Sequence, residues 1–257
     1  MTELNVGELS PKNILHQLSE RLPQWRYTHL SRDRARTSPF YEESNFGSQN
    51  GYYQGRLIIG RDTRINTGVY LGANNREAIV VDDSYKNSEL KRVYFNVINK
   101  RMKDVSQGIA LSEGLLRDLL DIVQQEIPYD SNKVELFHLK QGDIADKKIA
   151  LDAYIRLGAG VCRHQALLGA YVLERMIEEG RITGKVSIDR NFVRGKGGHA
   201  WIRYTRGDGA VFIVDPAQNY IGYLDDIKDN KRWFYERPSD LGIRKLVARI
   251  VSPKKEM

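Results

Sequence analysis

The segment Gly158–Met176, GAGVCRHQALLGAYVLERM, contains Cys162, the single cysteine among 257 residues. Apolar residues follow it at the spacing of a helix: Ala166, Ala170, Leu173 and Ile177. This spacing predicts an amphipathic helix that begins at Cys162, with the cysteine in line with the apolar stripe. A cysteine in this place is either a small buried core residue or a nucleophile.

The second alternative has a specific physical basis in the first turn of a helix. This turn carries unpaired backbone N–H groups and about half a positive charge, which stabilise a thiolate and can bind an oxyanion. Gly158 and Gly160 lack side chains, so we expect a substrate backbone to approach here. His164 lies about 200° round the helix from Cys162, so it points away from the thiol, towards the surface or a supporting position. Arg163 either acts on the thiol or an acidic substrate, or it faces solvent.

A glycine-flanked histidine stands in the segment Gly195–Gln218, GKGGHAWIRYTRGDGAVFIVDPAQ. The runs HAWIRY and VFIVD are typical of strands, and TRGDGA between them favours a turn, so we predict a β-hairpin. If the loop holds an odd number of residues, such as 207–209, Trp201 pairs with Asp215, and His199 lies on the same face as Asp215. A two-residue loop would place them on opposite faces. Asp215 can orient the His199 imidazole only if the loop is odd-numbered, and the sequence allows such a loop.

Together the segments GAGVCRHQA, GGHAWIRY and FIVDPAQ resemble the G-x-G-x-C, G-H-A-W and D-P motifs of the transglutaminase-like superfamily, in order and in spacing. The upstream sequence LLRDLLDIVQQEIPYD resembles the helix that opens the core of that family. The resemblance covers roughly residues 111–224, and VCRHQA departs from the aromatic or acidic residue that usually follows the cysteine. It implies an α+β fold with a papain-like core, in which the nucleophile begins a helix packed on an antiparallel sheet that carries the histidine and the aspartate.

By this resemblance Cys162 is the nucleophile, His199 is the general base and acid, and Asp215 orients the imidazole. Trp201 either walls the cleft or only packs beside it, and Gln218 either lines the site or lies at the surface. The candidate substrate-binding residues are Gly160, Arg163, Trp201 and Gln218.

The chemistry that the resemblance implies is acyl transfer through a thioester. Water as the acceptor gives proteolysis or glutamine deamidation, whereas an amine acceptor gives transglutamination. We favour hydrolysis of a peptide bond or a glutamine side chain in a protein, because water is the default acceptor. The alternative from a different class is a non-catalytic binding scaffold. We expect no cofactor and no metal, since one cysteine and scattered histidines make a poor zinc site.

The amino-acid composition limits the binding partners and the cellular location that we expect for the protein. The net charge is +7 and the pI about 9.3, but the basic residues are scattered without an aromatic-basic repeat, so we expect no specific nucleic-acid binding. A single cysteine excludes an internal disulfide. No signal-peptide pattern and no apolar run of about 18 residues stands out, so we expect a cytoplasmic protein without a membrane span; non-classical export stays open.

The pattern of apolar and polar residues changes along the chain. We predict a β-rich N-terminal region, 1–105, that recognises the substrate or partner, and a catalytic core, 106–257; the two are compatible with one shared core. Expected N-terminal elements are a helix at 10–22, an arginine-rich loop at 28–51, and antiparallel strands within 52–60, 68–74 and 77–84. The segment 89–102 is compatible with a strand or a helix, and we favour the helix. Expected core elements are a helix within 112–130 that is capped by Ser112 and closed by Pro128, a polar loop, and a short helix within 146–160. The three glycines of 189–198 predict a mobile loop, which is either a lid over the cleft or an ordinary surface connection.

Overall fold

The computed structural model describes residues 36–42, 51–72, 77–107, 114–145, 147–193, 197–227 and 235–240. It has an α+β fold, as predicted. The largest sheet is antiparallel, in the order β10-β9-β8-β7. Its strands are β7 (Gly184–Val193), β8 (Gly197–Arg206), β9 (Val211–Asp215) and β10 (Tyr220–Tyr223).

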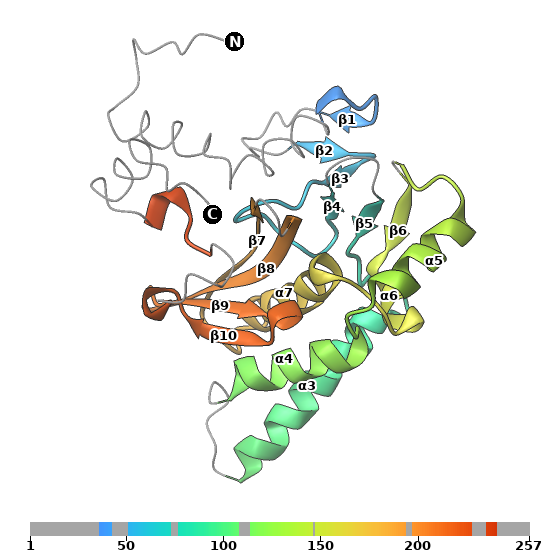
Figure 1. Ribbon diagram of the computed structural model, residues 1–257. Helices are drawn as coiled ribbons and strands as arrows, with labels where there is room; N and C mark the ends of the chain where they lie inside the picture. The colour runs from blue at the N-terminus through green and yellow to red at the C-terminus, as the bar shows by residue number, and fades with distance from the viewer. Residues whose placement is uncertain are drawn as a thin grey trace, which may run out of the picture.

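Helix α7 (Cys162–Glu178) packs against one face of this sheet (Figure 1). The alternation of side chains along β8 turns Ala200, Ile202 and Tyr204 into the large apolar cluster that also contains the buried residues of α7. Helix and strand approach closely at Gly169, where an added Cβ would collide with the end of the Ile202 side chain. The predicted helix that begins at Cys162 is therefore confirmed, and its apolar stripe lies on the sheet.

The predicted mobile loop is wrong for the residues that the structure describes. Positions 189–193 continue β7, and β8 begins at Gly197, which pairs with Val193; residues 194–196 lie outside the described part. Asp189 and Asn191 are buried strand residues, and the Asp189 carboxylate accepts a hydrogen bond from Arg237 Nε. The prediction was based on the glycines of this segment, but Gly197 and Gly198 lie within the paired strand β8.

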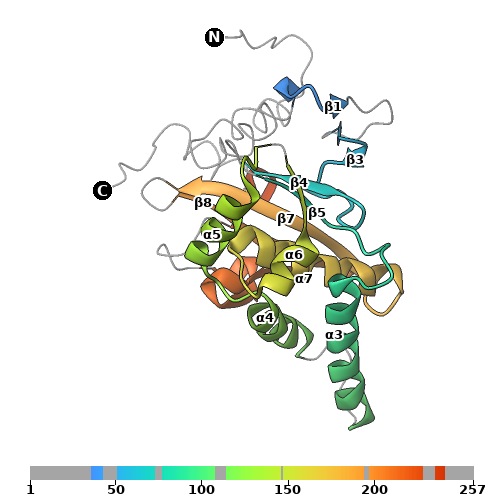
Figure 2. The same cartoon turned by 90° about the vertical axis from the view of Figure 1, so that its right-hand side faces the viewer.

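Three other predicted helices are confirmed: α3 (Glu89–Ser106), α4 (Leu115–Glu126) and α6 (Leu151–Leu157). Helix α4 is preceded by Gly114 as its N-cap, while the predicted cap Ser112 lies outside the described residues. Helix α6 ends at Gly158, whose φ of 59° is the left-handed conformation that glycine adopts most easily. Figure 2 shows α3 extending away from the side that carries β1 and β3. None of the helices in the described ranges has the length and apolar character needed to cross a bilayer.

The predicted polar loop after α4 is wrong, because it contains helix α5 (Ser131–Gln141), and β6 (Lys148–Ala150) follows it. Val134 is the one residue of α5 that is fully buried, so no apolar stripe marks the helix. The helix is instead defined at its ends. The Asp130 side chain accepts a hydrogen bond from the Lys133 N–H at 2.8 Å, and Gly142 follows with a φ of 74°.

The described part of the N-terminal region contributes strands to two small sheets. One contains β1 (Tyr41–Glu42), β2 (Tyr52–Tyr53) and β3 (Arg56–Leu57), and the other contains β4 (Val69–Leu71), β5 (Ala78–Val80) and β6. The pairing of β4 with β5 is antiparallel, as predicted. The run 52–60, predicted as one strand, instead contains β2 and β3, which pair with each other antiparallel, and β5 pairs in parallel with β6. The pair β5–β6 and the main apolar cluster both join residues from the two sides of position 105. The predicted helix at 10–22, and the loop at 28–35 and 43–50, lie outside the described residues.

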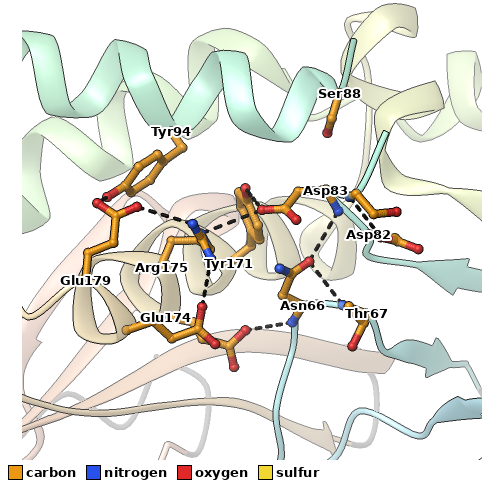
Figure 3. A network of polar contacts seen from close by, with 12 residues as sticks. Asn66, Thr67, Asp82, Asp83, Ser88, Tyr94, Tyr171, Glu174, Arg175 and Glu179 are labelled. Carbon is orange, nitrogen blue, oxygen red and sulfur yellow. Dashed lines mark hydrogen bonds and ion pairs between the residues drawn. The ribbon is translucent and has the colours of Figure 1, made fainter. Parts of the chain in front are cut away.

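Buried polar contacts tie the N-terminal region to α7 (Figure 3). The Glu174 carboxylate accepts hydrogen bonds from the backbone N–H groups of Ile65, at 2.7 Å, and Asn66, at 2.6 Å. The Tyr171 hydroxyl donates to Asp83 Oδ2 at 2.8 Å, and burial raises the pKa of both Tyr171 and Glu174. The N-terminal region is thereby fixed to the helix whose first residue is Cys162.

Candidate active site

The β8–β9 hairpin places His199 beside Asp215. The Arg206 N–H donates to the Ala210 carbonyl at 2.8 Å, so the loop consists of the three residues 207–209, as predicted. With this odd-numbered loop, His199 Nε2 lies 2.6 Å from Asp215 Oδ2. A carboxylate oxygen accepts hydrogen bonds, so the proton of this bond is on Nε2. The predicted contact between the two side chains is therefore confirmed.

Cys162, at the first position of α7, contacts the same histidine. Its side chain forms hydrogen bonds with the His199 imidazole and with the backbone N–H of Ala200. Because Nε2 faces Asp215, Nδ1 is the ring nitrogen that faces the sulfur. Cys162 is partly exposed, whereas His199 and Asp215 are buried. The structure thus brings the three residues into one continuous chain of contacts.

The electrostatics of this chain favour a thiolate and an imidazolium. Burial acts to raise the pKa of the Cys162 thiol, but the hydrogen bond from His199, together with the charges of His199 and Arg163, lowers it below its usual range. Burial acts in the opposite sense on His199, but its hydrogen bonds to Asp215 and Cys162 raise the pKa of the imidazole to about 9. Both shifts favour the charged form of the pair, a thiolate beside an imidazolium.

Asp215 is held by more than the histidine. Its Oδ1 accepts a hydrogen bond from the Gln218 backbone N–H at 3.2 Å, which caps the short helix η1 (Pro216–Gln218). Its Oδ2 accepts a second hydrogen bond, from the Tyr235 hydroxyl, at 2.7 Å. Asp215 therefore both caps a turn and supports the imidazole. Gln218 contributes its backbone N–H, and its side chain does not line the cavity described next.

An open cavity of about 390 Å³ lies at Cys162 and His199. Besides residues of α7 and β8, its wall includes side chains from α5 and residues from the N-terminal region: Ser131, Glu135, His138, Tyr70 and Gly72. Both the missed helix α5 and the strand β4 therefore contribute to the site. Sequence reasoning missed these residues because they belong to segments far from the three motifs.

Arg163 and His164 are buried beside the nucleophile, so the solvent-facing interpretation of Arg163 and the surface interpretation of His164 are wrong. Arg163 Nε and Nη2 donate to Glu77 Oε1 at 2.9 and 2.7 Å. His164 Nδ1 accepts the Val161 N–H at 3.0 Å, so Nε2 carries the proton and donates to Glu77 Oε1 at 3.2 Å. Burial and the charge of Arg163 lower the pKa of His164 to about 3, so this imidazole is neutral.

Glu77 is the centre of this buried cluster and is itself 1% exposed. Burial acts to raise its pKa, but the hydrogen bond from His164 and the charge of Arg163 hold it well below the usual range. Glu77 therefore neutralises Arg163 beneath the nucleophile. The signal in the sequence was a charged residue directly before the apolar strand β5, but no spacing rule links that position to Cys162.

Gly160 and Trp201 support the packing around the site. An added Cβ at Gly160 would collide with the Ile127 side chain and lie 2.9 Å from His164 Cβ, so the missing side chain admits neighbouring protein atoms. Trp201 is fully buried and packs edge-on against Tyr235, with ring centroids 5.0 Å apart. Neither Gly160 nor Trp201 lines the cavity. For Trp201, the structure therefore favours packing over a role in the cleft wall.

Over the described ranges, no three histidine, cysteine, aspartate or glutamate side chains gather in a way that would hold a metal ion. In comparisons with known proteins, no family model, no curated protein and no solved structure matches this chain.

Proposed function

We propose that the protein is a transglutaminase-like, cysteine-dependent amide hydrolase that acts through a thioester on a peptide bond or a glutamine side chain of a protein. The observation that carries this proposal is the unbroken chain of contacts from Cys162 through His199 to Asp215 at an open cavity. The lowered pKa of the thiol and the raised pKa of the imidazole support it, because an activated cysteine needs both.

In the first half of the reaction, the Cys162 thiolate attacks the carbonyl carbon of the amide. The oxyanion that forms lies close to the N–H groups at the start of α7, which are aimed at developing negative charge. The imidazolium of His199 gives its Nδ1 proton to the departing nitrogen as the C–N bond breaks. Ammonia leaves from a glutamine side chain and an amine leaves from a peptide bond, and the acyl group remains on sulfur.

In the second half, water replaces the departed amine. His199, now neutral, removes a proton from the water through Nδ1 while the oxygen attacks the thioester carbonyl. The C–S bond breaks, the carboxylic acid is released, and the thiolate–imidazolium pair is restored. Asp215 stabilises the charged imidazole in both halves without taking its proton.

The cavity supports a substrate with a polar group at the reacting end. Its volume of about 390 Å³ suits a side chain or a short peptide segment. Ser131, Glu135 and His138 supply a hydroxyl, a carboxylate and an imidazole at its wall, groups that can form hydrogen bonds to an amide. The α5 and β4 residues of this wall are therefore the positions at which we place substrate selection.

The test is the intact mass of candidate protein substrates after incubation with wild type, Cys162→Ala, or Asp208→Asn, which changes an exposed residue of the β8–β9 loop as a control. Each reaction is run with and without a small primary amine. We expect a Cys162-dependent gain of about one dalton for deamidation, or cleavage for proteolysis, and the control should match wild type. Amine incorporation would instead identify a transglutaminase. Substrates that never change in a Cys162-dependent way would contradict the proposal and favour a binding scaffold.

A further inference from the structure

Residues 235–240 contact side chains of the main sheet that point away from α7. Tyr235 begins this segment and belongs to an apolar cluster with Trp201, Ile213 and Leu224, none of which is part of the cluster that contains the buried residues of α7. Its ring packs edge-on against Trp201 and stacks on Tyr220 with ring centroids 5.6 Å apart. Tyr235 is 2% exposed, so this packing fixes the direction of its hydroxyl.

That hydroxyl reaches the carboxylate that supports His199. It donates to Asp215 Oδ2 at 2.7 Å, and the same oxygen accepts the His199 Nε2 proton at 2.6 Å. Two donors on one oxygen, with the Gln218 N–H on the other, leave the buried carboxylate little freedom to rotate. Tyr235 thus acts on the imidazole through Asp215.

Ion pairs at two residues, Arg237 and Asp240, anchor the segment that carries Tyr235. Arg237 donates from Nε and Nη2 to the two oxygens of Asp189, at 2.8 and 2.6 Å, and from Nη2 to Ser187 Oγ at 2.8 Å. Its Nη1 also donates to Asp62 Oδ2 at 2.8 Å, so the anchor joins β7 to the N-terminal region. Fixed at Arg237, the chain presents Tyr235 in one place.

The second anchor lies three residues further on. Arg203 on β8 forms a bidentate pair with Asp240, at 2.8 and 2.7 Å, and Asp240 Oδ2 also accepts the Arg237 N–H at 2.6 Å. Bidentate arginine–carboxylate pairs fix orientation as well as distance. Both ends of this short segment are therefore held against the sheet.

We propose that Tyr235 is a positioning residue, whose hydroxyl fixes the Asp215 carboxylate against His199 and moderates the charge that the imidazole meets. This inference rests on the proposed function. The ionisable groups that act most strongly on His199 are Asp215 on β9 and Cys162 on α7, while Arg163 acts on the thiol. Nearby on β7, Asp189 is neutralised by Arg237. The Tyr235 hydroxyl and the His199 imidazole therefore donate to the same oxygen of Asp215 and share its negative charge.

Loss of the Tyr235 hydroxyl should change the pKa of His199 in one direction. Without the Tyr235 hydroxyl, the Asp215 carboxylate has one donor fewer and its charge acts more fully on the imidazolium, so the pKa of His199 rises. An imidazolium that holds its proton more tightly, on a less firmly placed carboxylate, is a poorer acid towards the leaving group. Tyr235→Phe should therefore lower kcat several-fold and leave KM nearly unchanged.

The test is NMR titration of [13Cε1]histidine-labelled protein from pH 6 to 10.5, with the His199 signal identified by its absence in His199→Gln. We expect a wild-type midpoint of about 9 and, in Tyr235→Phe, a midpoint about half a pKa unit higher, a threefold change in proton concentration. Tyr204→Phe is the matched control, since it removes the hydroxyl of a tyrosine on β8, which donates to the Thr183 carbonyl at 2.7 Å. Its midpoint should equal that of wild type.

The outcomes separate this inference from the proposed function. A wild-type midpoint near 9 that is unchanged or lowered in Tyr235→Phe would overturn the role of Tyr235 and leave the proposed function standing. A wild-type midpoint at the ordinary histidine value would contradict the thiolate–imidazolium pair, and with it both proposals. Thermal unfolding of each variant establishes that the spectra come from folded protein.

Discussion

His199 Nε2 and Asp215 Oδ2 lie 2.6 Å apart because a three-residue loop brings two neighbouring strands into a single register. Since side chains alternate between the faces of a strand, a shift of that register by one residue would separate the two groups to opposite faces. The contact therefore depends on the loop length as much as on the identity of the two residues.

Asp215→Asn should remove most of the activation of Cys162. The hydrogen bond and charge of Asp215, together with those of Cys162, raise the pKa of His199 against its burial. With a neutral amide in that place, the imidazole loses its proton near neutral pH and the thiolate loses its counter-ion. A rise of one unit in the pKa of a mostly protonated thiol lowers its thiolate fraction tenfold, so we expect the rate of alkylation of Cys162, measured between pH 6 and 8, to fall by up to about tenfold.

The control for that experiment is Asp208→Asn, in the loop of the same hairpin, where the aspartate is exposed and pairs with Arg206. It should label at the wild-type rate. Equal labelling of Asp215→Asn and wild type would show that Asp215 has no part in the activation.

The activity should have a bell-shaped dependence on pH. Its acidic limb reports ionisation of the Cys162 thiol, whose pKa is lowered, and its basic limb reports loss of the His199 proton at about 9. As pH rises through the basic limb the imidazolium is lost, so no acid remains for the leaving nitrogen. The measurement is kcat/KM between pH 4 and 10.5 on a substrate found in the mass experiment. A rate that only rises, with its midpoint at the value of an ordinary thiol, would be incompatible with the charged pair.

Glu77 and Arg163 should behave as one unit in stability. Glu77→Leu alone leaves the buried guanidinium without its carboxylate, and Arg163→Met alone leaves a buried carboxylate, so each should cost about 3–5 kcal/mol of unfolding free energy. The double variant removes both charges and should cost clearly less than the sum. Urea unfolding of the four proteins measures this coupling. Additive losses would mean that the pair is not energetically linked.

Gly160→Ala should destabilise the fold by about 1–3 kcal/mol, because the added methyl group overlaps the Ile127 side chain. Truncation of that neighbour in Gly160→Ala/Ile127→Ala makes room, so the combined loss should be smaller than the sum of the single losses. In both variants that contain Gly160→Ala, KM should stay close to wild type. A large rise in KM with unchanged stability would instead support the expectation that Gly160 admits substrate.

Local patterns in the sequence predicted the parts of the site that lie within single elements. The helix after Cys162 has an apolar stripe, and the hairpin has two strand-like runs around a glycine-rich turn, so both elements and their pairing followed from spacing. The contact of His199 with Asp215 could be predicted because register alone determines it. The contact of Cys162 with His199 joins separate elements and was inferred from a resemblance.

The remaining parts of the site come from long-range contacts that no local pattern records. Glu77 meets Arg163 across 86 residues, and Tyr235 meets Asp215 across a turn and β10. Helix α5 was missed for a different reason: Leu136 and Leu139 are exposed, so its apolar residues do not follow the usual stripe. The ends of α5, at Asp130 and Gly142, were the usable signals.

The measurement that tests the central claim most directly is the alkylation rate of Cys162 by iodoacetamide at pH 6, in the folded protein and in the same protein unfolded in urea. The chain has one cysteine, so every label reports this thiol. We predict that the folded protein reacts at least about tenfold faster, because His199 and Arg163 hold the thiol as a thiolate where a free thiol is protonated. A folded protein that reacts more slowly than the unfolded chain, with a rate that climbs as for an ordinary thiol up to pH 9, would contradict the account.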